Sequence, residues 1–529
     1  MGDDIVQLSF RIAMKVFKPV IGILYRTGLI YPMALSLVQE LMGPGVMPTW
    51  LYILALLLCN YLFFQSVMRL IKKDKKLKLY NLLLGRSQSR EERLYTRPKV
   101  NPSLLFSEPT GFVFGRYKGK WVCRDESSSG HIAICGGPGS GKSASCGICS
   151  LLSWGKNSND PVFAIDIKGE LYAKTKHQRP NSKVFSLTLP EAYGFNPFYL
   201  IDEKGNIIEQ IKSIADILIP IPPDTKDPFW KNSSRNYLTA CLVWAWEVGC
   251  PFAEIMRLIQ ITPPDEMIAG ICGSKKEKAL LFANQFRSMP SETLAGIFGE
   301  TCNAILPFAT DDQLRAALSK PKEQCISPED LNNGTSIYLC LEEYKLEALR
   351  QFLTLIVGQF LRAFEQRTEG ENTRVLFLLD EFPRLGKLEV LSGLATLRSK
   401  NVAICLIFQS LAQLDLIYGR DQRKAIIDNC GFIGLLKVSD PESQKYFADA
   451  IGTYDKTKKS YSDNQQDLNM FGSSGTSTTT EEKRRMKPED LNQLTDELIL
   501  ISGYGFNRIK KSFYFKEPYF QKLLNAPRK

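Results

Sequence analysis

Short runs of apolar residues recur along the chain beyond about residue 110, and they predict the strands of a buried sheet. The runs are continuous rather than alternating, as in parallel strands that are covered on both faces. The predicted strands are His131–Cys135, Val162–Asp166, Lys183–Leu187, Ser336–Cys340, Arg374–Asp380, Val402–Phe408 and Phe432–Val438. A further pair, Leu498–Ser502 and Arg508–Phe515, is expected to close one edge of this sheet.

A different pattern separates two of these strands. From about residue 226 to 330, apolar positions follow helix-like spacing and runs of β-branched residues are few, as in Tyr237–Trp246 and Ser291–Phe298. Helical segments grouped between strands indicate a separate layer rather than crossovers of the sheet. The two patterns together predict an α/β domain that contains an inserted all-helical subdomain.

An apolar region near the N-terminus predicts a membrane anchor. No charged residue occurs from Leu41 to Met68, and a span needs about 20 predominantly apolar residues. A weaker apolar stretch precedes it and contains Arg26, which lies near one end and can reach the interface. We expect a two-helix hairpin with spans at about 19–41 and 48–68. The alternative is an in-plane amphipathic helix followed by one span.

Positive charge is concentrated directly after this apolar region. The formal net charge is +11, and residues 69–100 hold 11 Lys or Arg against 3 Asp or Glu, which gives 11 − 3 = +8. Basic residues beside a span favour the cytosolic side and attract anionic membrane lipid; a nucleic-acid contact is the alternative. We therefore expect a multi-pass protein of the inner or cell membrane, with the N-terminus and the bulk of the chain in the cytoplasm.

The composition excludes several classes of protein. A chain of 529 residues suggests about three domains, and 44% hydrophobic with 23% charged residues excludes wholesale disorder. The 13 cysteines are scattered and fit reduced thiols better than a disulfide framework. Cys146 and Cys149 have C-x-x-C spacing, but we expect them to pack on one helix face. Two histidines exclude a His-rich metal site.

A glycine-rich loop follows the first predicted strand and carries the clearest chemical signal. Its pattern is G-x-x-x-x-G-K-S in a strand–loop–helix context, in which backbone N–H groups and a helix N-terminus surround phosphates. Lys142 is expected to reach the β- and γ-phosphates of a nucleoside triphosphate, and Ser143 to hold Mg²⁺. The loop residues are Gly136, Gly137, Pro138, Gly139, Ser140, Gly141, Lys142 and Ser143.

An acidic strand end supplies the expected partner of the loop. Five apolar residues precede Asp380 and Glu381, which places both carboxylates at the carboxyl edge of the sheet, where sites of α/β proteins form. Asp380 is expected to bind Mg²⁺, and Glu381 to activate or position the attacking water. Gln409 ends another strand and is a candidate sensor of the γ-phosphate, although a capping role is equally compatible.

One long segment has few apolar anchors. Residues 455–485 are polar and rich in Ser, Thr, Lys and Asn. Such a composition does not supply the apolar area that a packed element needs. We expect a mobile loop at 455–485.

Several segments, taken in order, resemble the type IV secretion coupling proteins, the TraG/TraD-type ATPases of conjugation. The resemblance covers about 110–520, and the predicted anchor fits it. Its most specific parts are the Asp166–Glu170 and Asp380–Gly386 segments. The segments are Gly111–Arg116, the phosphate loop, Asp166–Glu170, Phe195–Phe198, Asp227–Trp230, Leu379–Gly386 and Ile407–Ser410.

The resemblance implies a RecA-like P-loop motor domain with an all-alpha insertion, assembled as a homo-oligomer in the family's form, a ring of six subunits (a hexamer). It implies ATP and Mg²⁺ as cofactors, and DNA, expected to be single-stranded, with a bound relaxase as the substrate handed to type IV secretion channel components. Arg398 falls where the family has a candidate arginine finger; a solvated helix residue is the other interpretation.

These inferences give an expected organisation and three candidate functions. The first is a membrane-anchored ATPase that couples a DNA–relaxase substrate to a conjugation channel. The second is a DNA-pumping ATPase of the FtsK/HerA kind, and the third is a membrane receptor that docks substrates without motor activity. The expected parts are a membrane anchor (1–68), a basic linker (69–110), the first half of the NTPase domain (111–225), the all-alpha insertion (226–335) and the second half (336–529).

Overall fold

A computed structural model describes residues 95–156, 158–222, 225–369, 373–463 and 474–525. The predicted membrane spans at 19–41 and 48–68, and most of the predicted basic linker, lie outside these residues. Within the described ranges, no helix combines the length and the apolar composition that crossing a bilayer requires.

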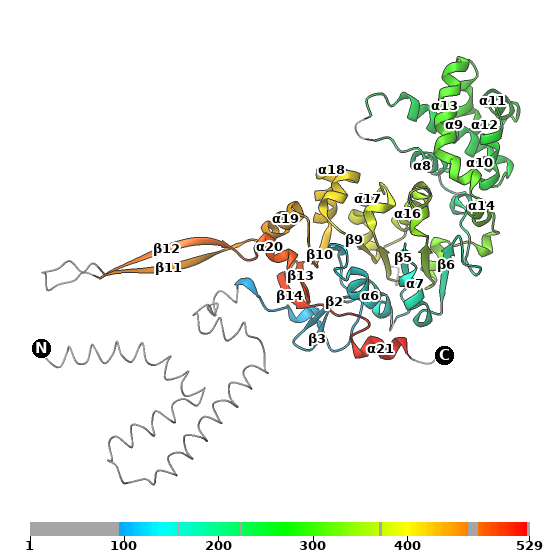
Figure 1. The fold of residues 1–529 in the computed structure, drawn as a ribbon. Helices are drawn as coiled ribbons and strands as arrows, with labels where there is room; N and C mark the ends of the chain where they lie inside the picture. Colours follow the sequence, from blue (N-terminus) through cyan, green and yellow to red (C-terminus); the bar gives the residue numbers. More distant parts are fainter. Residues whose placement is uncertain (1–94, 157, 223–224, 370–372, 464–473, 526–529) are drawn as a thin grey trace, which may run out of the picture. The chain divides into compact units, whose positions relative to one another are not determined.

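A twelve-stranded sheet forms the centre of the structure (Figure 1). Its order is β1-β3-β2-β14-β13-β10-β4-β9-β8-β5-β7-β6. The strands from β10 to β6 are parallel, whereas β13 joins β10 in antiparallel register. The strands are β1 (Leu105–Phe106), β2 (Phe112–Tyr117), β3 (Lys120–Arg124), β4 (His131–Cys135), β5 (Val162–Asp166), β6 (Ser182–Ser186), β7 (Ser336–Cys340), β8 (Val375–Leu379), β9 (Val402–Phe408), β10 (Cys430–Leu435), β13 (Glu497–Ser502) and β14 (Gly505–Lys510).

Each apolar run that predicted a parallel strand forms one, with boundaries shifted by a few residues at most. The reason is burial on both faces: successive residues of β4 alternate between two core clusters, with Ala133 in one and Ile132 and Ile134 in the other. The C-terminal pair also forms, but its second strand ends at Lys510. Residues 511–515 lie outside the sheet, beside the glycine-rich loop.

Helices cover both faces of the parallel part of the sheet, which makes this an α/β fold. In Figure 1, α6 and α7 lie on one face and α16, α17 and α18 on the other. The helices of this layer and of the C-terminal region are α6 (Ile148–Ser153), α7 (Glu170–Thr175), α16 (Arg350–Glu365), α17 (Val390–Thr396), α18 (Leu411–Asp428), α19 (Pro441–Ile451), α20 (Pro488–Asn492) and α21 (Pro518–Leu524).

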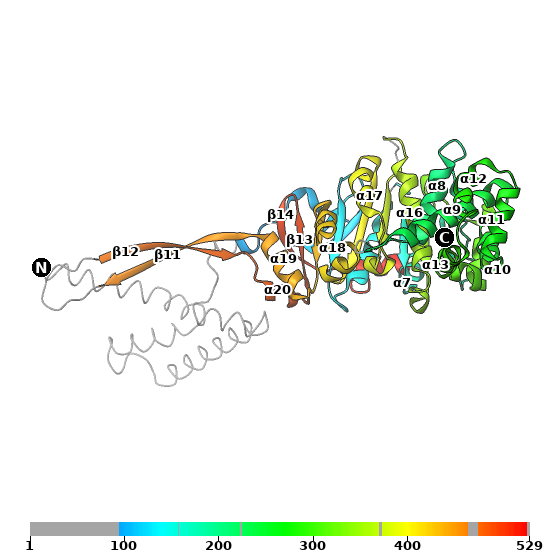
Figure 2. The ribbon, with the colours of Figure 1, turned by 90° about the horizontal axis from the view of Figure 1, so that it is seen from above.

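The chain between β6 and β7 is helical in its described part. Figure 2 shows α9 to α13 gathered together beside the sheet. The Trp230 ring packs so closely on Gly296 of α13 that a Cβ there would lie 2.7 Å from a ring carbon. The helices are α8 (Ile207–Leu218), α9 (Phe229–Val248), α10 (Phe252–Ile261), α11 (Pro264–Gly273), α12 (Glu277–Ala283), α13 (Ser291–Thr310), α14 (Asp312–Leu318) and α15 (Pro328–Asn332).

The segment 455–485, for which we expected a loop, contains strands instead. β11 (Thr453–Asp463) and β12 (Ser474–Arg484) pair in antiparallel register, from Thr453 opposite Arg484 to Asp463 opposite Ser474 (Figure 1). Backbone hydrogen bonds between the two strands define this element, and they leave no mark on the pattern of apolar positions. Composition alone therefore gave the wrong secondary structure here.

Candidate nucleotide site

The glycine-rich loop connects β4 to a helical turn, Lys142–Gly147, that continues into α6. Gly139 and Gly141 have φ angles of 67° and 89°, a region in which residues with a Cβ are strained. At Gly141 an added Cβ would also lie 2.7 Å from a carbon of the Phe513 ring. The loop is held at its start, since Gly137 N–H donates to the Lys437 carbonyl at 2.6 Å.

Lys142 lies folded against this loop. Its Nζ donates to the carbonyl of Gly136 at 2.7 Å, and the Gly137 carbonyl lies at 3.4 Å. Burial lowers the pKa of the ammonium, and the carboxylates of Glu381 and Asp380 oppose that shift. The buried Ser140 hydroxyl has no hydrogen-bond partner in the described structure. A buried cation and an unsatisfied hydroxyl in one glycine loop suit the binding of an anion.

Ser143 and Asp380 meet across two neighbouring elements. Ser143 Oγ donates to a carboxylate oxygen of Asp380 at 3.0 Å. Burial raises the pKa of Asp380, and the hydrogen bond from Ser143 opposes this rise. A hydroxyl and a carboxylate are oxygen ligands of the kind that Mg²⁺ takes in phosphate sites. The residues present therefore fit the predicted metal, and the pair lies where the sequence placed it.

Glu381 is buried and has an unusual backbone conformation. Its φ and ψ of 49° and 41° are left-handed, which is uncommon for a residue other than glycine. Gln409, at the end of the neighbouring strand β9, donates its Nε2–H to the two carboxylate oxygens of Glu381 at 3.1 and 3.4 Å. The predicted acidic residue and the predicted sensor are thus hydrogen-bonded to each other.

Arg398 lies away from this group. It precedes β9, so it is at the amino edge of the parallel sheet, and its guanidinium donates to Ser129 Oγ at 3.1 Å. Seven residues of β9, at about 3.3 Å each, separate that edge from Gln409 by roughly 20 Å. The structure therefore brings together all predicted site residues except Arg398.

Sequence reasoning missed the contacts that the end of the chain makes with the loop. Lys511 is buried and donates from Nζ to the Ser140 carbonyl at 3.2 Å, and Tyr514 N–H donates to the Ala144 carbonyl at 3.3 Å. These residues were expected to belong to a strand. The only signal was the aromatic run after Ser512, which does not tell where the run packs.

Asp166 also lies at the carboxyl edge, at the end of β5. It accepts a hydrogen bond from Tyr172 N–H at 2.8 Å. Burial raises its pKa, and the nearby Asp380 carboxylate raises it further. In the sequence, Asp166 stands out only as part of a family motif. The hydrogen bond from Tyr172 joins Asp166 to the first turn of α7, which gives this part of the motif a role in positioning that helix.

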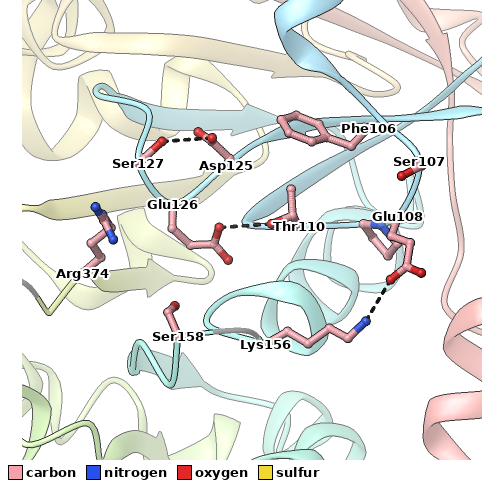
Figure 3. Close-up of a pocket in the computed structure, with 11 residues that line it drawn as sticks. Phe106, Ser107, Glu108, Thr110, Asp125, Glu126, Ser127, Lys156, Ser158 and Arg374 are labelled. Carbon is pink, nitrogen blue, oxygen red and sulfur yellow. Dashed lines mark hydrogen bonds and ion pairs between the residues drawn. The ribbon is translucent and has the colours of Figure 1, made fainter.

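A cavity of about 390 Å³ lies at the amino edge of the sheet (Figure 3). Glu126 on its wall accepts from Thr110 Oγ1 at 3.1 Å, and Lys156 pairs with Glu108 at 3.2 Å. Arg374, which directly precedes β8, marks the edge at which the cavity lies. No predicted site residue lines the cavity, so it is separate from the glycine loop.

The glycine loop between a central parallel strand and a helix, with an acidic strand end beside it, defines an α/β protein of the P-loop class. Residues 84–529 match the family model described as type IV secretory system conjugative DNA transfer. This protein belongs to that family.

Two proteins of one bacterium are among the relatives of the chain. It is 26% identical over 424 residues to "Conjugal transfer protein TraG" and 25% identical over 438 residues to "Protein VirD4", both of Agrobacterium fabrum. These matches cover 75% and 79% of this chain but 62% and 64% of the relatives. The chain thus matches less than two thirds of the length of either protein.

Solved structures with the same fold are those of a bacterial conjugative coupling protein, TrwB. An unbound form gives a TM-score of 0.60 at 17% identity, covering 74% of this chain and 87% of the other. A complex with an ATP analogue gives a TM-score of 0.59 at 16% identity, covering 82% and 95%. A further TrwB structure contains ADP and Mg²⁺. At this identity the likeness establishes the fold.

Proposed function

We propose that this protein is a membrane-anchored ATPase that couples a DNA–relaxase substrate to a type IV secretion channel and drives its transfer by ATP hydrolysis. The observation that carries the proposal is the hydrogen bond from Ser143 to Asp380. It joins the phosphate loop to the acidic strand in a member of a conjugative DNA transfer family.

The site residues divide the chemistry of ATP hydrolysis among them. The backbone of the loop and Lys142 would bind the phosphates, and Ser143 and Asp380 would hold Mg²⁺, which would supply positive charge beside the phosphate oxygens. Glu381 accepts a proton from the attacking water, and Gln409 fixes the orientation of that carboxylate. The structure of TrwB in complex with ADP and Mg²⁺ supports the choice of an adenine nucleotide and Mg²⁺ as the bound groups.

The position of Arg398 supports an assembly in which sites are completed between subunits. Its distance from the loop of its own chain leaves it available to a neighbouring subunit, where a guanidinium stabilises charge on the transferred phosphate. A hexameric ring would supply this contact at every interface. The uncharged segment ending at Met68 and the basic segment after it support anchoring of that ring in a membrane that contains anionic lipid.

DNA transfer between cells that carry the full-length protein tests this function. Lys142→Ala and Glu381→Gln variants at wild-type abundance should both abolish transfer, because the motor needs binding and turnover. Undiminished transfer by Glu381→Gln would favour a docking receptor. DNA-stimulated ATP hydrolysis by the purified full-length protein, without any requirement for a relaxase or channel in vivo, would favour a DNA pump of the FtsK/HerA kind.

A further inference from the structure

The last residues of the sheet domain cross the phosphate loop as a strap, defined here as residues Lys511–Phe515. The strap follows β14 directly and is held by hydrogen bonds from Lys511 and Tyr514. Lys511 Nζ donates to the carbonyls of Ser140 and Leu494, both at 3.2 Å, and Tyr514 N–H donates to Ala144. Between these points the Phe513 ring lies directly against Gly141. The strap therefore has a fixed position beside the loop.

Two aromatic rings of the strap pack against each other, and one of them is exposed to solvent. Phe513 and Phe515 are neighbours, with ring centroids 5.4 Å apart and planes inclined by 34°. Tyr514 between them packs on the core cluster that includes α6, and its ring also contacts that of Phe515, with centroids 5.3 Å apart. Phe515 remains 48% exposed. The Lys516 ammonium lies 5.0 Å from the Phe513 ring centroid and 5.9 Å from that of Phe515.

The strap lies on the side of the loop where the nucleoside of a bound nucleotide is expected. In the sheet, β9 and β8 lie on one side of β4 and carry Gln409, Asp380 and Glu381 at their ends. These groups fix the γ-phosphate end. The strands β10, β13 and β14 lie on the other side of β4, and the strap follows β14. A nucleotide that points its γ-phosphate at Glu381 therefore extends its base toward the strap.

We propose that Phe513 and Phe515 form the subsite that stacks the base of the bound nucleotide. The inference rests on the proposed function and adds the group that recognises the nucleoside. An exposed phenylalanine beside a polar phosphate site loses its contact with water when a flat base covers it. Phenylalanine offers no hydrogen bond to the edge of a base, so the subsite takes purine nucleotides as a class and discriminates poorly between adenine and guanine.

Binding of ADP and of inorganic tripolyphosphate, each with Mg²⁺, to the full-length protein tests this subsite by calorimetry. Tripolyphosphate has no base, so it reports on the loop alone. Phe515→Ala should weaken ADP about 5- to 150-fold and leave tripolyphosphate unchanged. Phe515→Tyr should retain ADP affinity, because tyrosine also stacks. Tyr504→Ala, which removes an exposed ring (57% exposed) in the β13–β14 turn, is the matched control and should change neither affinity.

The outcomes separate the subsite from the proposed function. Equal weakening of ADP and tripolyphosphate by Phe515→Ala, or no change in either, would overturn the stacking role while leaving the nucleotide site in place. Failure of the wild-type protein to bind either ligand would overturn both. Phe513→Leu keeps an apolar side chain against Gly141 and should weaken ADP selectively as well. If neither Phe515→Ala nor Phe513→Leu weakens the binding of ADP selectively, the assignment is wrong.

Discussion

Gln409 and Glu381 are joined side chain to side chain across two paired strands, at 3.1 and 3.4 Å. Because all five residues of β8 pair with β9, the amide and the carboxylate extend from the ends of two strands that are held together. The orientation of Glu381 therefore exists before any nucleotide binds. A general base such as this carboxylate, when it is already oriented, needs little rearrangement in the transition state.

Glu381→Gln should retain ATP binding and lose hydrolysis by about 10²–10⁴-fold, since the amide cannot accept the proton of the attacking water. Lys142→Ala should lose binding or turnover, because the loop then lacks its buried cation. Calorimetry and phosphate release measure the two properties separately. Normal hydrolysis by Glu381→Gln would contradict the role given to this residue.

Gln409→Ala should lower the rate of hydrolysis by roughly 10- to 100-fold with nucleotide affinity unchanged, because the carboxylate of Glu381 loses its partner. The double variant with Glu381→Gln should be no slower than Glu381→Gln alone, since both changes act on one group. Additive losses in this cycle would mean that Gln409 contacts the nucleotide independently of Glu381.

Arg398→Ala should bind ATP normally and hydrolyse it about 10³–10⁵-fold more slowly, as fingers in related phosphoryl-transfer systems do. Because Arg398 lies at the opposite edge from Lys142 of its own chain, mixing Arg398→Ala with Lys142→Ala should restore part of the activity. Crosslinking first verifies that mixed assemblies form. If they do, and activity stays at the level of the parents, the role between subunits is wrong.

Asp380→Asn should raise the melting temperature of the nucleotide-free protein at neutral pH, on the order of 2 °C. Burial raises the pKa of Asp380 in the folded protein above its unfolded value. Stability from this group is therefore greatest below the unfolded pKa and is lost as the pH rises through the folded pKa. Asparagine has no such charge, so the gain should shrink as the solution is acidified. A lower melting temperature than wild type at pH 7 would refute this account.

A cysteine introduced at position 4 should resist an impermeant thiol reagent applied to intact cells, because a two-helix hairpin places the N-terminus in the cytosol. Permeabilised cells provide the positive control for labelling. Strong labelling in intact cells would leave the model with a single span.

The parallel sheet and most of the site could be predicted because their signals are local. Continuous apolar runs mark strands that are buried on both faces, and the loop motif fixes Lys142 and Ser143 within eight residues. Asp380 could be matched to Ser143 because carboxyl ends of parallel strands share one edge.

The remaining features depend on tertiary placement. Phe513 reaches Gly141 only through the position of β14 in the sheet, whereas the predicted strand Val402–Phe408 already separated Arg398 from Gln409. The β11–β12 ribbon is formed by backbone pairing between polar segments, for which apolar periodicity carries no signal.

The left-handed backbone at Glu381 sets activity against stability at one position. A side chain in that conformation costs ~1–2 kcal/mol that glycine would not incur, and the same residue buries a carboxylate. Thermal selection applied to this protein would therefore favour glycine at position 381 and recover robust variants that no longer turn over. A heat-resistant natural variant that retains glutamate here must obtain its added stability elsewhere in the chain.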